Sequence, residues 1–497
     1  FSYEVTRSLA ACEGALLLDF ASRRAQGTAR ACHAHHGRRP YGGGSATWGV
    51  GGDFVLDYPL ISEHGLIGDL QTAALVSTDG SVDWFCAPRF DSPSVFGALL
   101  DARDGGEFRV RPVADEFTTK QLYLPDTAIL ITRFLTQAGV GEVVDFMPVQ
   151  PGPTPSGRHR LVRMLRCVRG QITFSVHLAP RFDYGRDPHR VTVTEHGAVF
   201  RGSHDAMVAH VVREPGDERL ARAGADEKGD VHGEITLSAG EVRGIVVETG
   251  AADNPREMRV SEVQRLFDET VDFWESWLGQ STYSGRWREE LDRSAITLKL
   301  MTYAPSGGLV AAPTAALPEQ VGGERNWDYR YTWIRDSAFT LYALMRIGFT
   351  EEAARFIDWI EARCHELEVD GSLQTMYGID GRHNLGEEIL DHLEGYRGSR
   401  PVRIGNAAYQ QQQTDIYGEL MDSVYLYNKY GTPISISFWK EARRLLDWVC
   451  RHWQEKDHGI WEVRGEPQHF VYSKLMSWVA LDRGLRLAEK RSLPAEH

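Results

Sequence analysis

The sequence predicts a multidomain protein of the β + α class, in which an antiparallel β-sandwich precedes a helical domain. From about residue 53 to residue 254, apolar and polar residues alternate with a period of two, as they do in strands that bury one face. After Pro255 the period changes to that of amphipathic helices. The 497 residues leave room for about two to four domains, so the change of period marks a domain boundary.

Residues 1–52 differ from the rest in composition. They carry six arginines against three acidic residues and end in a glycine-rich run. This composition is typical of disorder, and we expect a disordered or misassigned leader. Cys32 and the three histidines that follow it do not have the spacing of a zinc site.

The predicted sandwich covers residues 53–254. Residues 128–136 and 141–147 flank a short turn and predict one hairpin. Residues 161–168 and 171–178 predict a second hairpin around an Arg-Gly pair. Many strands at regular spacing, with no helical period between them, are typical of an antiparallel sandwich.

Residues 255–285 are expected to form a helical linker, with an amphipathic helix at 260–278. The domain that follows, 286–497, contains six more predicted helices, at 287–303, 333–347, 351–367, 413–430, 436–454 and 470–490. Long loops separate some of these helices. Long loops inside a compact domain are usually functional.

The composition excludes several classes of partner. A formal net charge of −14 argues against nucleic acid or an anionic membrane, since either would require a basic face. No apolar stretch is long enough to span a bilayer. The six cysteines lie far apart without a CxxC pair, which is typical of reduced thiols in a cytoplasmic protein. Because no GxGxxG, Walker, HExxH or GxSxG motif occurs, we expect no cofactor and no metal ion.

The first candidate site is the run 325–338, where a helix is predicted to begin. It holds four aromatic and five charged residues. Aromatic faces can stack on the C–H surface of a sugar, and Arg335 and Asp336 can each make paired hydrogen bonds to its hydroxyl groups. The run also fits a helix cap with a surface ion pair. Such a density of groups at a loop–helix junction favours a binding site.

The second candidate is Glu462, in the short run 459–465 between two predicted helices. A carboxyl group beside Trp461, near an arginine and between glycines, is placed to have its pKa raised by partial desolvation. A general acid needs such a pKa near neutral pH. A single glutamate in a loop is more often a solvated charge, and the run alone favours that interpretation.

A third run, 405–415, places amide and carboxylate groups before a predicted helix. These groups could bind sugar hydroxyls, or they could form a polar entry to the helix. The pattern does not favour one over the other.

Three separated motifs resemble glycoside hydrolase family 15. The run 329–338 (YRYTWIRDSA) resembles the first active-site segment of that family. Residues 460–462, followed by 471–483 (VYSKLMSWVALDR), resemble the segment that bears its catalytic acid. The run 65–101 is similar to the start of the bacterial and archaeal branch. The motifs occur in the family's order, so the resemblance is specific, and it covers about residues 55–497.

The resemblance implies a β-sandwich followed by an (α/α)6 barrel, with a small α-glucoside held at one end of the barrel. It also implies hydrolysis in one inverting step, in which a carboxylic acid protonates the glycosidic oxygen and a second carboxylate activates water. Glu462 matches the general acid. The expected substrate-binding residues are two that hold the nonreducing glucose, Arg335 and Asp336, and three aromatics, Tyr329, Trp333 and Trp461.

An (α/α)6 barrel needs twelve helices, and the sequence predicts six. By the resemblance, therefore, only about the first half of the barrel is present, the C-terminal part is missing, and the catalytic base is not among these residues. The chain alone is expected not to turn over substrate. The favoured activity is that of an α,α-trehalase, because the branch with a sandwich leader resembles this chain most. The alternatives are an exo-acting glucoamylase or α-glucosidase, a sugar phosphorylase, and a noncatalytic sugar-binding protein.

Overall fold

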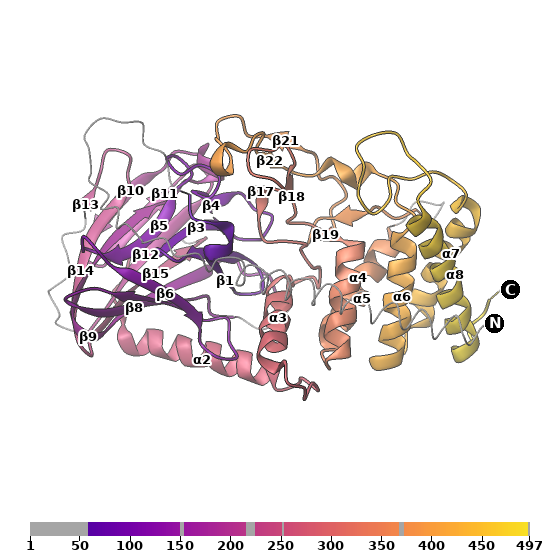
Figure 1. The fold of residues 1–497 in the computed structure, drawn as a ribbon, viewed down its shortest axis with the longest axis horizontal. Coiled ribbons are helices and arrows are strands. Elements are labelled where there is room, and N and C mark those ends of the chain that lie inside the picture. The colour runs from indigo at the N-terminus through magenta and orange to yellow at the C-terminus, as the bar shows by residue number, and fades with distance from the viewer. Residues whose placement is uncertain (1–57, 150–153, 215–223, 251–252, 367–371, 496–497) are drawn as a thin grey trace, which may run out of the picture. The chain divides into compact units, whose positions relative to one another are not determined.

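The computed structural model describes residues 58–149, 154–214, 224–250, 253–366 and 372–495. The leader expected at 1–52 lies outside these residues. The described chain begins with β-strands and continues with α-helices (Figure 1), as the change of period after Pro255 predicts.

The first part is one large β-sheet. Its strands are β1 (His64–Gly68), β2 (Ala73–Ser77), β3 (Ser81–Cys86), β4 (Ser94–Phe96), β5 (Glu107–Pro112), β6 (Thr118–Tyr123), β7 (Leu130–Leu135), β8 (Gly139–Phe146), β9 (His159–Ala179), β10 (Arg190–Thr194), β11 (Gly197–Arg201), β12 (Ala206–Arg213), β13 (Gly224–Ala225), β14 (Val231–Ser238), β15 (Val242–Thr249) and β16 (Met258–Arg259). The main path of the sheet runs β1-β2-β3-β5-β9-β15-β12-β11-β10. Among the described strands, neighbours are antiparallel, except that β16 is parallel to β12.

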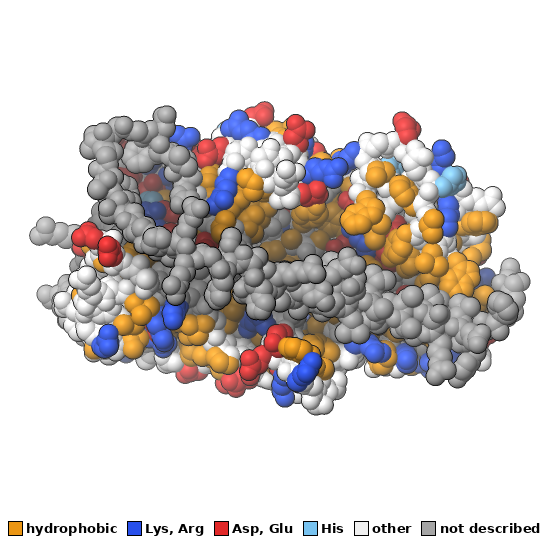
Figure 2. All heavy atoms as spheres, viewed as in Figure 1, with side chains coloured by type: hydrophobic (Ala, Val, Ile, Leu, Met, Phe, Trp, Pro, Cys, Tyr) orange, Lys and Arg blue, Asp and Glu red, His pale blue; other side chains and the backbone are white. Residues whose placement is uncertain are grey.

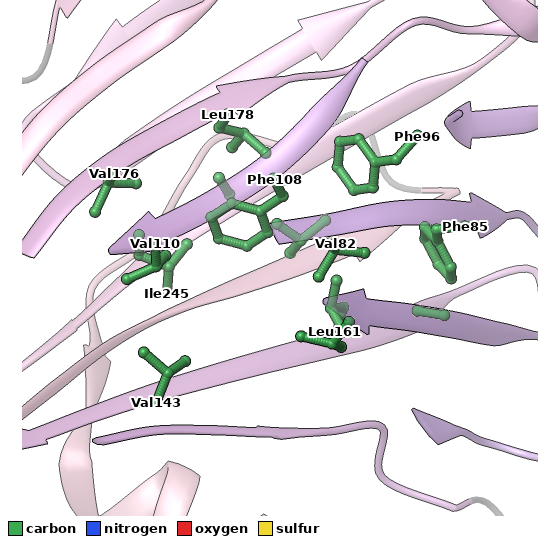
Figure 3. Close-up of a cluster of buried hydrophobic side chains, with 14 of the residues drawn as sticks. Val82, Phe85, Phe96, Phe108, Val110, Val143, Leu161, Val176, Leu178 and Ile245 are labelled. Carbon is green, nitrogen blue, oxygen red and sulfur yellow. The ribbon is translucent and has the colours of Figure 1, made fainter. Parts of the chain in front are cut away.

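Strand β9 joins the two halves of this sheet. Its first half pairs with β8 and β15, and its second half pairs with β5 and β14. Side chains from both halves meet in one apolar core, in which Phe108 and Val176 come from one half and Val143 and Ile245 from the other (Figure 3). Burial of this apolar surface is the main source of stability for the β-rich part.

One predicted hairpin is confirmed and the other is wrong. Strands β7 and β8 pair antiparallel, as the runs 128–136 and 141–147 predict. The runs 161–168 and 171–178 instead lie in the single strand β9. At Gly170, which has a φ of 73°, the strand changes partners without reversing direction. An Arg-Gly pair is typical of a turn, but here the glycine allows a local irregularity within a continuing strand.

The second part is helical, and every predicted helical segment contains a helix. The helices are α2 (Val260–Leu278), α3 (Arg288–Leu300), α4 (Ile334–Arg346), α5 (Glu351–His365), α6 (Ile416–Tyr430), α7 (Ile436–His452) and α8 (Val471–Arg491). Short strands lie in the connections: β17 (Ala315–Pro318), β18 (Asn326–Asp328), β19 (Thr332–Trp333), β20 (Met376–Tyr377), β21 (Glu388–Ile389) and β22 (Arg403–Ile404). Short 3-10 helices are η1 (Ile61–Glu63), η2 (Asp183–Gly185), η3 (Tyr396–Gly398) and η4 (Ala407–Gln410).

Helices α6 and α8 approach each other closely at Gly418. A Cβ atom at this position would lie 2.2 Å from the carbonyl oxygen of Met476 on α8, so any larger residue would push the helices apart. Helix α7 packs against the same core through Trp439 and Trp448, which are both buried. The close packing fixes the ends of α6 and α8, and these ends carry several residues of the site described below.

A buried arginine fixes the start of the helical part to the β-rich part. Arg330 donates to both carboxylate oxygens of Asp328, through Nε at 2.9 Å and Nη2 at 2.7 Å. It also donates to the carbonyl oxygen of Ser92 at 2.7 Å and to the hydroxyl of Tyr184 at 2.8 Å. Burial opposes the charge of Arg330, but Asp328 outweighs it and raises the pKa of the guanidinium. The first candidate run therefore has a rigid support.

Candidate active site

Glu462 lies on the acid loop, residues 457–468, which connects α7 to α8. The ends of the loop pair with each other: the N–H of Asp457 donates to the carbonyl of Gln468 at 2.9 Å, and the reverse bond is 2.8 Å long. The carboxylate of Asp457 accepts the backbone N–H of Thr414 at 2.9 Å and its hydroxyl at 3.0 Å. The acid loop is thus closed at its base and attached to the segment before α6.

Within the acid loop, Glu462 has a left-handed backbone. Its φ is 52°, and its N–H donates to the carbonyl of Gly459, which has a φ of 63°. A residue with a Cβ atom in this conformation costs about 1–3 kcal/mol, and such residues cluster at functional sites. The surrounding contacts must hold Glu462 in this conformation.

The side chain of Glu462 meets the start of α4, which lies more than a hundred residues earlier in the sequence. The indole Nε1 of Trp333 donates to Oε1 of Glu462 at 2.6 Å. Nη2 of Arg335 lies 3.5 Å from the same oxygen, and Nη1 donates to the carbonyl of Ile460 at 3.1 Å. The side chain of Glu462 is only 19% exposed. Both contacts fall on Oε1.

Of the three further residues expected at the site, Asp336 and Tyr329 lie around this contact and Trp461 does not. Asp336 approaches Arg335 at 3.2 Å and keeps 41% of its side chain exposed, so it can still reach a ligand. The ring of Tyr329 lies 5.7 Å from that of Trp333, measured between centroids. Burial, followed by the charges of Glu319 and Glu462, raises the pKa of Tyr329 to about 12, so its hydroxyl stays protonated. Trp461 is 84% exposed and is therefore not packed into this group.

Two more carboxyl groups lie close enough to influence Arg335. Burial opposes the charge of this arginine, but Asp336, Glu462, Glu419 and Asp415 together raise its pKa. Asp415 and Glu419, at the start of α6, are 0% and 3% exposed. Burial raises the pKa of both carboxyl groups, and the charge of Asp415 raises that of Glu419 further.

Sequence reasoning named the run that contains Asp415 but missed Glu419. The hydroxyl of Tyr472 donates to Oε1 of Glu419 at 3.0 Å, which joins α8 to α6 behind the site. The signal was available: Asp415 and Glu419 are four residues apart, so they share one face of α6. That face also holds buried apolar residues of the core, where a carboxyl group is unusual.

Two arginine side chains stack on the ring of Trp327, and one of them, Arg464, belongs to the acid loop. The guanidinium of Arg464 lies 4.2 Å from the ring centroid of Trp327, and that of Arg403 lies 4.7 Å from it. Arg464 also donates to Oδ1 of Asn406 at 3.3 Å, and it lies 3.6 Å from a carboxylate oxygen of Glu387. The backbone two residues after Glu462 is therefore held by stacking and by polar contacts.

Two kinds of feature are absent from the described residues. Over these ranges, no group of three or more His, Cys, Asp or Glu side chains is arranged to hold a metal ion. Over the same ranges, no helix combines the length and the apolar character that crossing a membrane requires.

Comparison with known proteins links both parts of the chain to one group of proteins. The model of glycosyl hydrolases family 15 matches residues 285–497, and a model described as trehalase-like, N-terminal matches residues 47–265. The trehalase of Mycolicibacterium smegmatis is 40% identical over 460 residues, which cover 87% of this chain and 66% of that protein. The trehalase of Mycobacterium tuberculosis is 38% identical, with the same coverage of 87% and 66%.

An archaeal relative is similar over a comparable length. The trehalase of Thermoplasma volcanium is 35% identical over 447 residues, which cover 89% of this chain and 69% of that protein. The chain thus spans about two thirds of the length of the curated relatives that it matches. A solved structure, described as a putative kojibiose phosphorylase from human microbiome, has a TM-score of 0.40 and 9% sequence identity, and the match covers 77% of this chain and 56% of that one.

Proposed function

The chain belongs to glycosyl hydrolases family 15, and on that premise we propose that its site hydrolyses α,α-trehalose with inversion of configuration. The observation that carries the proposal is the contact of Glu462 with Trp333 and Arg335, which joins two of the family-like motifs in one site. The relatives named above are described as trehalases, and their similarity extends over the β-rich part as well as the helices.

In the proposed reaction, Glu462 is the general acid. The Trp333 N–H and the Arg335 guanidinium fix its Oε1, and the proton on Oε2 passes to the glycosidic oxygen as the bond to the anomeric carbon breaks. A second carboxylate takes a proton from the attacking water on the opposite face of the sugar. We assign that base to no residue of the described chain.

The remaining site residues would bind the sugar. Arg335 and Asp336 present planar polar groups that can each bind adjacent hydroxyls of the nonreducing glucose. Tyr329 offers aromatic surface beside them, whereas Trp333, expected to line this subsite, is only 1% exposed and contacts Glu462 through its indole N–H. Trp461, which is 84% exposed, is free to stack on the second glucose. The proposed substrate is therefore a small, neutral α-glucoside.

For the architecture, we propose that the large sheet is a β-sandwich and that α3 to α8 are the first half of an (α/α)6 barrel. The core shared by the two halves of the sheet supports the sandwich. Helix α8 supports the barrel, because it packs against α6 yet exposes Val471, Leu475 and Trp478 by 87%, 43% and 49%. Figure 2 shows hydrophobic side chains over the helical part on the face that it draws. Apolar surface of this kind is expected where further helices pack.

The test compares Glu462→Gln with the parent enzyme, in the protein expressed from its whole reading frame. The amide cannot supply the proton, so kcat for trehalose is expected to fall by about 10²–10⁴-fold while sugar affinity is kept. Unchanged turnover would show that Glu462 is not the acid. If the same protein prefers maltooligosaccharides to trehalose, it is an exo-acting glucoamylase or α-glucosidase. A requirement for phosphate would indicate a phosphorylase, and sugar binding without turnover would indicate a binding protein.

A further inference from the structure

The segment 411–414, which leads into α6, contacts the acid loop at both its base and its tip. At the base, Thr414 binds the carboxylate of Asp457. Next to it, the carbonyl of Gln412 accepts the N–H of His458 at 3.1 Å. At the tip, the side chain of Gln411 reaches the peptide that follows Glu462. The run of glutamines therefore contacts the acid loop, which neither interpretation of the sequence predicted.

Gln411 uses its side-chain amide as a double donor. Its Nε2 donates to the carbonyl of Glu462 at 3.4 Å and to that of Val463 at 3.3 Å. These bonds are long, but the amide is held in place: Nε2 of the buried Gln413 donates to Oε1 of Gln411 at 3.2 Å. The hydroxyl of Thr375 donates to the backbone carbonyl of Gln411 at 3.1 Å. The side-chain amide and the backbone carbonyl of Gln411 therefore both have partners.

The contacts of Gln411 hold the backbone conformation of Glu462, which determines where its carboxyl group lies. The direction of the Glu462 carbonyl is set by ψ of Glu462, since the peptide that follows is planar. The N–H of the same residue is bound to Gly459. Hydrogen bonds on both sides of its Cα atom thus hold Glu462 in the left-handed conformation, which a residue with a Cβ atom does not prefer. From this backbone its carboxyl reaches Trp333 and Arg335.

We propose that Gln411 is a positioning residue for the general acid, and that its amide keeps the backbone of Glu462 in the conformation that presents the carboxyl to substrate. The inference rests on the proposed function, because it takes Glu462 as the acid. Arg464 holds the next part of the loop through Trp327, Asn406 and Glu387. Loss of Gln411 alone therefore loosens the tip without releasing the whole loop.

The first arm of the test needs no catalysis. Hydrogen–deuterium exchange is measured on the 497-residue chain carrying Gln411→Ala or Gln411→Glu, without a ligand. The glutamate keeps the size and an acceptor for Gln413 but cannot donate when ionised. We expect the amides of Glu462 and Val463 to exchange about tenfold faster in both variants, as local opening becomes easier. Gln410→Ala is the matched control, since this exposed neighbour donates to the hydroxyl of Tyr409. Exchange equal to that of the control would overturn the proposal.

The second arm measures kinetics in the protein expressed from its whole reading frame, with Glu462→Gln alongside. For Gln411→Ala we expect about a tenfold fall in kcat, with KM within about twofold and an unchanged melting temperature, because a misplaced acid affects the transition state more than binding. If Glu462→Gln abolishes turnover and the Gln411 variants match Gln410→Ala, the positioning role is refuted while the proposed function stands. If Glu462→Gln leaves turnover unchanged, Glu462 is not the acid and the positioning role falls with it.

Discussion

The guanidinium of Arg330 holds the segment that leads to the site, so its removal is expected to lower the free energy of unfolding. In Arg330→Met, the carboxylate of Asp328, which is 0% exposed, loses its only charged partner among the contacts described here. The carboxylate keeps three donors: the N–H of Arg330 at 3.1 Å, the hydroxyl of Tyr331 at 3.2 Å and the N–H of Gly405 at 3.1 Å.

The expected fall in the free energy of unfolding of Arg330→Met depends on the donors that remain to Asp328. Removing one partner of a buried ion pair costs about 3–5 kcal/mol. Three donors to Asp328 remain and methionine fills much of the vacated volume, so we expect the lower end, about 3 kcal/mol. The carbonyl of Ser92 and the hydroxyl of Tyr184 also lose a donor, which argues against a smaller value.

The assay is urea unfolding of the 497-residue chain, followed by tryptophan fluorescence. Adding Asp328→Asn to Arg330→Met removes the uncompensated charge, so the double variant is expected to recover at least about 1 kcal/mol relative to additivity. Arg325→Met is the matched control: its side chain is 76% exposed and its ion pair with Glu319 is 3.4 Å long, so we expect a change within about 0.5 kcal/mol. Equal stability of Arg330→Met and this control, or full additivity in the double variant, would refute the reasoning.

Two further predictions concern catalysis and pH. Trp333→Phe removes the indole donor to Glu462 and is expected to lower kcat for trehalose by about 10–100-fold, whereas Trp287→Phe, at a 54% exposed position, leaves kcat unchanged. Burial opposes ionisation of Glu352, but Lys299 outweighs it and lowers the pKa of Glu352 from 4.5. The ionised group therefore stabilises the fold above pH 4.5, and the melting-temperature deficit of Glu352→Gln at pH 7 should shrink as the pH falls below 4.5; a constant deficit would contradict this.

The sequence predicted the helices well because each helix has its own apolar periodicity. Helix α2 has the bounds that its apolar period predicts, Val260–Leu278, and the other helices lie within one to several residues of the predicted ends. The strand β9 shows where a local signal fails. Arg169-Gly170 is a turn pattern, yet the pairing of β9 with four other strands decides the outcome. Those partners lie far away in the sequence, so the local pattern could not indicate them.

For the site, the sequence predicted the candidates but not their contacts. Nothing in the residues around Glu462 indicates that its Oε1 meets Trp333 and Arg335, because 129 and 127 residues separate them. The motif resemblance supplied that link. The role of Gln411 could not be predicted from the sequence either, because it depends on the left-handed backbone of Glu462, which lies on another loop. Trp461, expected beside the substrate, stays a prediction.

The position of the site follows from the order of the helices. Connections at 347–350 and 431–435, after α4 and α6, are short, whereas those that precede α4, α6 and α8 are long. Short connections make consecutive helices antiparallel, and side-chain contacts show that the N-terminal ends of α4, α6 and α8 meet. Arg335 in the first turn of α4 contacts Glu462 before α8, and Thr414 before α6 binds Asp457 on the acid loop. The long loops, which tolerate functional residues, therefore converge at the ends where these three helices begin. A change that moves the N-terminal end of α8, such as a larger residue at Gly418, would therefore separate Glu462 from Arg335 even with every site residue intact.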